Sequence, residues 1–372
     1  MRTKSTRFAR FNLILTLGAL NLALVSPAYG QTTSLPLSTI EAASVGGSQQ
    51  SQIASFVDHW SERATGDDAQ QAARAQTKLL EPLINTRVSI SFRRAYSDAL
   101  GSYFDQLETN GDISSTMSAL RLAGELGSTR GTRLILNGLN NEDIGVQIFA
   151  AGRAGRTFRT TAANGPAMSA NDLSSLIAKL DSVASSSDDQ SLVSACVQAL
   201  GYGTTLPSDD FLASRAECIS AMCDAAGAQL TGGTSDLESR VRIAMLASGA
   251  ATNSLLQVGE DSNKDAIKSA VALGADMISI ALSDVLNNSM PPVGDRDLHV
   301  TLTRSGESLL YFALREHADL NRRPAGNVQQ TAFADLIEAG EDRSFRNQAA
   351  LLLGPGSPIV TDFDFKDDRF VH

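Results

Sequence analysis

The sequence predicts an all-α protein, an irregular stack of antiparallel helices with few or no strands. From about Ser48 onward, apolar residues recur at the three- and four-residue spacing of a helix face. Period-two alternation, which marks a half-buried strand, is nearly absent. Short polar and glycine-rich turns, such as the one at residues 231–235, separate the apolar stripes. Short connections between amphipathic helices favour packing of each helix against its sequence neighbours.

The first thirty residues have the order of a secretory signal peptide. Four basic residues precede an apolar run at 11–25, and the small residues Ala28 and Gly30 suit a leader-peptidase site. We therefore expect a Sec-type signal peptide at 1–30, cleaved after Gly30, and a periplasmic or secreted protein. A membrane anchor is the alternative, but the apolar run is too short to span comfortably. No later segment has the length and apolarity of a membrane span, so none is expected after cleavage.

Charge limits the classes of partner. The chain has a net charge of -10, and removing a leader with four basic and no acidic residues brings it to -14. Such an acidic surface repels nucleic acid and anionic lipid as a whole. Nucleic acid is therefore not an expected partner, and any binding of anions must rest on a local basic patch.

Composition divides the mature chain into three parts. Residues 31–47 are rich in Ser, Thr, Gly and Ala and predict a flexible N-terminal segment. Residues 48–356 carry the helical pattern. Their number favours either two domains or one elongated array over one compact core, and the helical pattern favours the array. Residues 357–372 predict an extended acidic C-terminal tail, in which Phe363 and Phe365 alternate with charged residues. This alternation suits a short strand or a strap across the last helices, and a frayed tail is the other interpretation.

Recurrent glycines predict how the helices end. Each of six follows an apolar stripe, and left-handed glycine caps are common at such positions: Gly127, Gly155, Gly201, Gly249, Gly274 and Gly354. Helix starts are expected after Asp209, Asp236 and Ser344, whose side chains can accept from free backbone amides.

One segment resembles a known repeat. Residues 119–155 contain the run Ala-Leu-Arg-Leu-Ala-Gly-Glu-Leu-Gly and, before the next helix, Asn140-Asn141-Glu142-Asp143, and this segment resembles HEAT repeats. The resemblance implies a right-handed superhelix of helix pairs that serves as a binding or scaffolding surface. Intervals between the glycines run from 25 residues (Gly249 to Gly274) to 80 (Gly274 to Gly354), so the array must be degenerate. A globular helical bundle is the alternative.

A local excess of arginine is the candidate binding site. Guanidinium forks suit carboxylate or phosphate partners, and three of these arginines are spaced at three residues near a predicted helix end. The alternative interpretation is a solvated face. The six candidate residues are Arg121, Arg130, Arg133, Arg153, Arg156 and Arg159.

The three cysteines allow at most one intramolecular disulfide. Helical rise places Cys218 roughly 6 Å and Cys223 roughly 13 Å out of axial register with Cys196. A disulfide between Cys196 and Cys218 is therefore the one pairing that the sequence allows. Cys223 shares an apolar stripe and is interpreted as a core residue.

No combination of residues predicts catalysis or a cofactor. Glu307-Ser308 within Gly306-Glu-Ser-Leu-Leu is similar to the Glu-Ser opening of lytic transglycosylases, which implies Glu307 as a general acid. The Gly-Leu-Met-Gln-like run of that family is missing downstream. Residues 261–265 have the first three ligands of a calcium loop but lack its glycine and its final acid.

We therefore expect a non-catalytic interaction or scaffold protein without a cofactor. Its expected partner is a protein or another anionic component of the cell envelope. An all-helical enzyme acting on envelope glycans, with Glu307 as its acid, is the alternative function.

Overall fold

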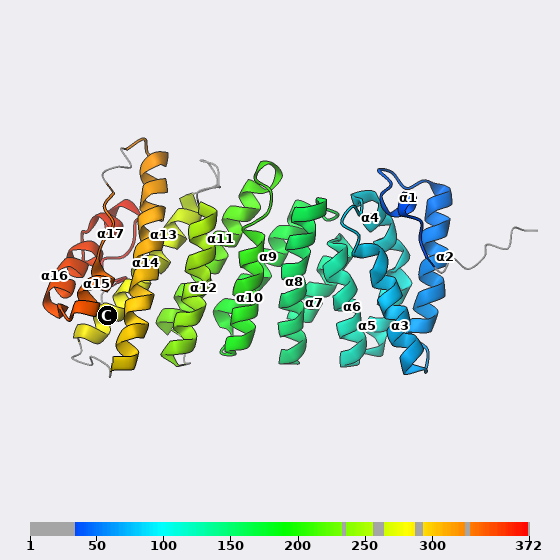
Figure 1. The fold of residues 1–372 in the computed structure, drawn as a ribbon, viewed down its shortest axis with the longest axis horizontal. Coiled ribbons are helices and arrows are strands. Elements are labelled where there is room, and N and C mark those ends of the chain that lie inside the picture. Colours follow the sequence, from blue (N-terminus) through cyan, green and yellow to red (C-terminus); the bar gives the residue numbers. More distant parts are fainter. Residues whose placement is uncertain (1–33, 233–235, 256–263, 287–292, 324–327, 371–372) are drawn as a thin grey trace, which may run out of the picture.

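The computed structural model describes residues 34–232, 236–255, 264–286, 293–323 and 328–370, and within these ranges it is helical (Figure 1). These ranges contain no strand, only an isolated bridge between Ser128 and Ala167. The predicted all-α class is confirmed. The helices are α1 (Leu37–Ile40), α2 (Gly47–Ala64), α3 (Ala69–Leu80), a 3₁₀ turn (Glu81–Leu83), α4 (Ile90–Ala99), α5 (Gly101–Asn110), α6 (Ile113–Leu126), α7 (Thr129–Leu139), α8 (Ile144–Asn164), α9 (Ala170–Ser186), α10 (Gln190–Gly203), α11 (Ser208–Gly232), α12 (Leu237–Leu255), α13 (Lys264–Leu286), α14 (Val293–Leu320), α15 (Phe333–Ala339), α16 (Asp342–Leu353) and α17 (Pro358–Asp362).

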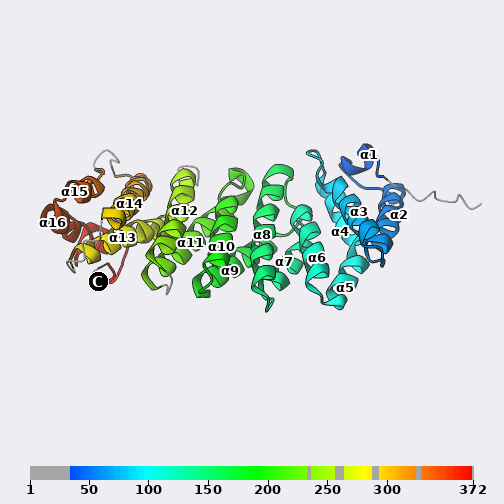
Figure 2. The same cartoon turned by 60° about the horizontal axis from the view of Figure 1, so that its bottom comes forward.

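From α6 to α14 the helices form two rows. One row consists of α6, α8, α10, α12 and α14, each in contact with the next, and the other consists of α7, α9, α11 and α13. Figures 1 and 2 show the helices following one another in chain order along the long axis of the molecule. The buried apolar side chains of both rows join one continuous cluster. Each helix therefore buries its stripe mainly against near neighbours in the sequence.

Aspartate side chains cap four helices of the first row, which are α6, α8, α10 and α12. The carboxylates of Asp112, Asp143, Asp189 and Asp236 each accept from the backbone N–H three residues later, at 2.9 to 3.0 Å. Such caps satisfy amides that have no partner within the helix. The predicted cap at Asp236 is confirmed, whereas Asp209 and Ser344 lie inside α11 and α16.

Most of the glycines that were predicted to end helices lie inside them. Gly127 does follow α6 in the left-handed conformation, with φ 52°, and Gly354 follows α16 with an ordinary φ of -73°. Gly155, Gly201, Gly249 and Gly274 are interior residues of α8, α10, α12 and α13. At some of these positions a neighbouring helix comes very close: a Cβ on Gly274 would lie 3.0 Å from the carbonyl oxygen of Gly306 in α14.

A buried arginine joins the ends of two first-row helices. Arg93 of α4 is fully buried and donates to the carbonyl oxygens of Leu126 (3.1 Å), Asn164 (2.9 Å) and Gly165. These carbonyls end α6 and α8, where the helix dipole is negative and no intrahelical donor remains. Burial, helped by the neighbouring Arg94, lowers the pKa of Arg93 to about 10. The guanidinium therefore remains charged at neutral pH.

The N-terminal segment is not loose where the structure describes it. Residues 34–46 include α1, and Ile40 is buried against the core. The backbone N–H of Ser89 donates to the carbonyl oxygen of Ile40 at 3.0 Å, which ties this segment to the start of α4. The scattered apolar residues of this segment thus pack against the helical core, which the composition of the segment did not predict.

The C-terminal segment is also packed, so the prediction of an extended acidic tail was wrong. Residues 357–370, here called the C-terminal strap, begin with α17 and end with Phe370 buried. Arg369 donates to both carboxylate oxygens of Asp276 in α13, at 2.7 and 2.6 Å, and Ser279 Oγ donates to the carbonyl oxygen of Phe370 at 2.7 Å. Burial raises the pKa of Asp276 to about 6, although Arg369 opposes the shift. Apolar anchors and one buried ion pair outweigh the acidic composition of the segment.

One helix has the length and apolarity of a membrane span, contrary to the expectation from sequence. In α13 the mean hydropathy of an 18-residue window reaches 1.6, yet 72% of that window is buried among other helices. Its apolar character is accounted for by its contacts with α11, α14 and α16. The predicted signal peptide lies outside the described residues.

Candidate functional site

The six candidate arginines do not form one cluster. Arg130 and Arg133 lie on α7, in one row of helices, whereas the other four lie on α6 and α8, in the other row. The structure therefore divides the predicted site into two surfaces. We call the surface around Arg130 and Arg133 the arginine groove. The surface formed by Arg121, Arg153, Arg156 and Arg159 is the arginine ridge.

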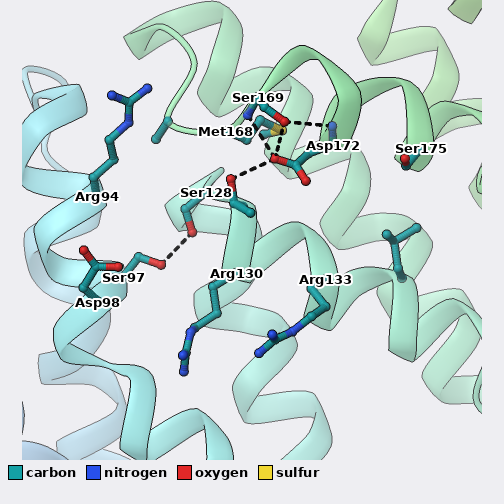
Figure 3. Close-up of a pocket in the computed structure, with 13 residues that line it drawn as sticks. Arg94, Ser97, Asp98, Ser128, Arg130, Arg133, Met168, Ser169, Asp172 and Ser175 are labelled. Atoms are coloured by element: carbon teal, nitrogen blue, oxygen red, sulfur yellow. Dashed lines mark hydrogen bonds between the residues drawn. The ribbon is translucent and has the colours of Figure 1, made fainter.

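The arginine groove is a cavity of about 730 Å³ between α4 on one side and α7 and α9 on the other. Its shape depends on two helix starts. Ser128 accepts from the backbone N–H of Gly131 at the start of α7, and Ser169 accepts from that of Asp172 at the start of α9. A buried hydrogen bond of 2.8 Å between the hydroxyls of Ser97 and Ser128 joins α4 to α7 (Figure 3). The positive ends of two helix dipoles thus face this groove.

Charged side chains line both ends of the groove. Arg130 and Arg133 extend toward one end, and Arg94 reaches from α4 at the other (Figure 3). Arg130 forms an exposed ion pair with Asp105 at 3.3 Å. Arg94 and Arg133 are exposed and form no ion pair within the described residues.

The remaining lining is mixed, and it includes the exposed carboxylate of Asp98 on α4, four residues after Arg94. Leu136, Ala167 and Met168 supply apolar surface. The Asp172 carboxylate accepts from the hydroxyls of Thr129 (2.8 Å) and Ser169 (2.6 Å), so its charge is largely satisfied. A groove with a partly apolar lining and guanidinium groups on separate helices suits a chain that carries carboxylates.

The arginine ridge has a different chemistry. The guanidinium carbon of Arg153 lies 4.8 Å from the ring centroid of Phe149, and that of Arg159 lies 4.4 Å from the centroid of Tyr202 in α10. Arg156 donates through Nε to Glu125 of α6 at 2.7 Å and pairs with the same oxygen through Nη2 at 2.6 Å. The aromatic rings hold the planes of two guanidinium groups, and one carboxylate neutralises a third.

The other three arginines of the ridge repel the charge of Arg153. Burial lowers the pKa of Arg153, and Glu125 opposes this effect. The nearby charges of Arg121, Arg156 and Arg159 lower that pKa further. The four arginines are therefore close enough to act on one another, which supports treating the ridge as one surface.

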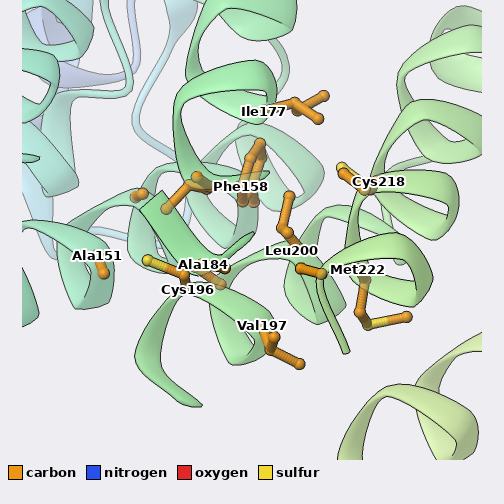
Figure 4. Packing of buried hydrophobic residues seen from close by; sticks show 14 of the residues in the cluster. Ala151, Phe158, Ile177, Ala184, Cys196, Val197, Leu200, Cys218 and Met222 are labelled. Atoms are coloured by element: carbon orange, nitrogen blue, oxygen red, sulfur yellow. The ribbon is translucent and has the colours of Figure 1, made fainter. Parts of the chain in front are cut away.

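The cysteine pairing is not supported by the positions of the side chains. All three thiols are free and buried. The Sγ of Cys218 packs against Gly203, seven residues beyond Cys196 in α10, which corresponds to about 10 Å along a helix axis. Figure 4 shows Cys196 and Cys218 on opposite sides of Leu200. The sequence argument correctly placed the helices of Cys196 and Cys218 next to each other, but it gave the wrong axial register between them. Burial raises the pKa of Cys196 to about 12.

Glu307 is engaged in holding a helix. It is 5% exposed, and its two carboxylate oxygens accept from the backbone N–H groups of Phe333 and Ala334 at the start of α15. A carboxylate at a helix N-terminus is a stabilising arrangement. With both oxygens occupied by backbone donors, Glu307 is placed to cap a helix, and the glycan-acting alternative loses its one named acid.

Metal chemistry has no candidate in the described ranges. Among those residues there is no group of three or more His, Cys, Asp or Glu side chains that could hold a metal ion. The weak calcium-loop match at 261–265 lies mainly outside the described residues.

Sequence reasoning missed Arg94, Phe149 and Tyr202. Arg94 follows Arg93 directly, but it falls outside the helical spacing that Arg93 shares with Tyr96, Ser97 and Leu100. Phe149 stands four residues before Arg153, which is the spacing of side chains that touch on a helix. Those two signals were available, whereas the contact of Arg159 with Tyr202 depends on how α10 packs.

No protein-family model, no curated protein and no solved structure matches this chain.

Proposed function

We propose that this protein is an exported, non-catalytic interaction scaffold that binds an acidic segment of a partner protein in the arginine groove. Its architecture is an irregular HEAT-like α-solenoid of antiparallel helix pairs. The groove carries the proposal, because it combines a cavity of about 730 Å³ with the guanidinium groups of Arg94 and Arg133, which form no ion pair within the described residues. It lies on a protein of net negative charge, so these positive charges are a local exception.

Two features support the solenoid. Alternate helices contact each other within each row, which is the arrangement expected when helix pairs stack. The capping aspartates Asp112, Asp143, Asp189 and Asp236 recur at intervals of 31, 46 and 47 residues. Similar starts at unequal intervals are consistent with a degenerate array.

An extended peptide is the ligand that suits the groove best. Arg94 and the Arg130–Arg133 pair lie at separate ends, so a small anion could reach only one of them (Figure 3). A chain with acidic residues at both ends of an apolar stretch would meet both sets of guanidinium groups. The overall negative charge disfavours a long polyanion such as nucleic acid.

The test uses a fluorescent peptide with glutamates at both ends of a leucine-containing stretch. Anisotropy should report binding to the wild-type mature protein at low salt. The double variant Arg94→Glu/Arg133→Glu should weaken it by at least about tenfold, because each lost charge-assisted hydrogen bond contributes about 1.5–3 kcal/mol.

The matched control is Arg74→Glu/Arg343→Glu, which changes the net charge equally. Both control residues are exposed and lie on α3 and α16, away from the groove. Equal loss in the two double variants would reduce the effect to net charge and would remove the groove as a site.

A further inference from the structure

The arginine ridge is formed where α6 and α8 approach closely. A Cβ added to Gly124 of α6 would lie 3.1 Å from the carbonyl oxygen of Arg153 and 3.2 Å from its Cβ. Only a residue without a side chain allows this approach. It brings Arg121 and Glu125, which lie on either side of Gly124 in α6, next to the arginines of α8.

The ridge holds more positive charge than its own carboxylate can neutralise. Four guanidinium groups share one acidic partner, Glu125, and that carboxylate is bound by Arg156. Arg121, Arg153 and Arg159 have no carboxylate partner within the described residues. Moreover, the buried Nε–H of Arg153 has no hydrogen-bond acceptor. A buried donor without an acceptor is unfavourable, so this close packing has a cost.

The guanidinium planes are held in place before any ligand arrives. Arg153 lies over Phe149 and Arg159 lies over Tyr202, so the faces of these two groups are covered and their N–H edges remain free to donate. Fixing a flexible arginine in advance reduces the entropy that binding must overcome.

We propose that the arginine ridge binds a phosphoryl group, with Arg121, Arg153 and Arg159 as its donors. A phosphoryl group offers three acceptor oxygens and a charge near two, whereas a carboxylate offers two oxygens and one charge. Glu125 already supplies one carboxylate to the ridge. The three remaining guanidinium groups are better matched by the higher charge of a phosphoryl group. This site is independent of the arginine groove, because the two surfaces lie on different rows of helices.

Calorimetric titration of the mature protein with inorganic pyrophosphate at low salt tests the site. The triple variant Arg121→Lys/Arg153→Lys/Arg159→Lys keeps every charge but removes the planar forks. We expect it to bind pyrophosphate at least tenfold more weakly than the wild type. The control variant Arg74→Lys/Arg343→Lys should bind as the wild type does.

Three results would overturn the proposal: no pyrophosphate binding by the wild type, equal affinity in the lysine variant, or equally tight binding of a glutamate peptide at the ridge. Vesicles distinguish the source of the phosphoryl group. Ridge-dependent binding to phosphatidylglycerol vesicles, with none to phosphatidylcholine, would assign it to an anionic lipid headgroup. Pyrophosphate binding without vesicle binding would assign it to a soluble or polymer-borne phosphate. Circular dichroism of each variant verifies that it is folded.

Discussion

Arg93 and Arg94 are neighbours in α4 with opposite environments. Arg93 is fully buried and holds the ends of α6 and α8, whereas Arg94 is exposed at the groove. The sequence contained this distinction, because Arg93, Tyr96, Ser97 and Leu100 follow the spacing of one buried stripe. What the spacing could not give is the identity of the acceptors, which come from residues 33 to 72 positions away.

Replacing Arg93 with alanine should strongly destabilise the protein. The change leaves three buried carbonyl groups without their donor, and the free energy of unfolding should fall by at least about 3 kcal/mol. Arg94→Ala, one residue later, should shift it by less than about 0.5 kcal/mol. Urea titrations followed by circular dichroism compare the two, and indistinguishable midpoints would contradict the role given to Arg93.

The division of the arginines could not be predicted from sequence. Arg133 and Arg153 are close in the chain and similar in spacing to their neighbours, yet α7 and α8 belong to different rows. Row membership is a property of how helices stack. For that reason the sequence could not show that the six arginines lie on two separate surfaces.

At the scale of the element, a glycine inside a stripe has two meanings that sequence does not separate. It can end a helix, as Gly127 does, or it can let another helix approach, as Gly274 does opposite Gly306. Both uses place glycine after small and apolar residues. The existence of helices was therefore predictable from periodicity, whereas several of their ends were not.

Alanine at two interior glycines should have opposite effects. In Gly274→Ala the new methyl group meets the backbone of Gly306 at 3.0 Å and Leu310 Cβ at 3.2 Å, so we expect destabilisation by about 1–3 kcal/mol. Gly249→Ala has nothing within 4 Å and should stabilise α12 by about 0.5–1 kcal/mol. Thermal unfolding of both variants measures this difference, and the same sign in both would refute the close crossing of α13 and α14.

At the scale of the whole molecule, the apolar stripes of the helices join one continuous buried cluster. The all-α class followed from periodicity alone. The packed ends did not, because the segments at 34–46 and 357–370 are polar in composition and owe their order to a few anchors such as Ile40 and Phe370. The mean composition of a segment does not reveal that a single apolar residue within it packs into the core.

Small-angle scattering should show an elongated particle. A compact domain of this length would have a radius of gyration of about 20 Å. We expect a larger value and an asymmetric distance distribution, because the helices follow the long axis in chain order (Figure 2). A radius near that of the compact domain, with a symmetric distribution, would refute the solenoid.

The C-terminal strap also bears on assembly. A stack of helices whose last pair is uncovered would expose an apolar surface on which a second molecule could stack. Repeated association of molecules in this way would give filaments. Here α15 and α16 cover α14 and α13, and Arg369 and Phe370 fasten the returning chain to α13. Together, α15, α16 and the C-terminal strap thus cover apolar surface of α13 and α14 that could otherwise associate with a second molecule.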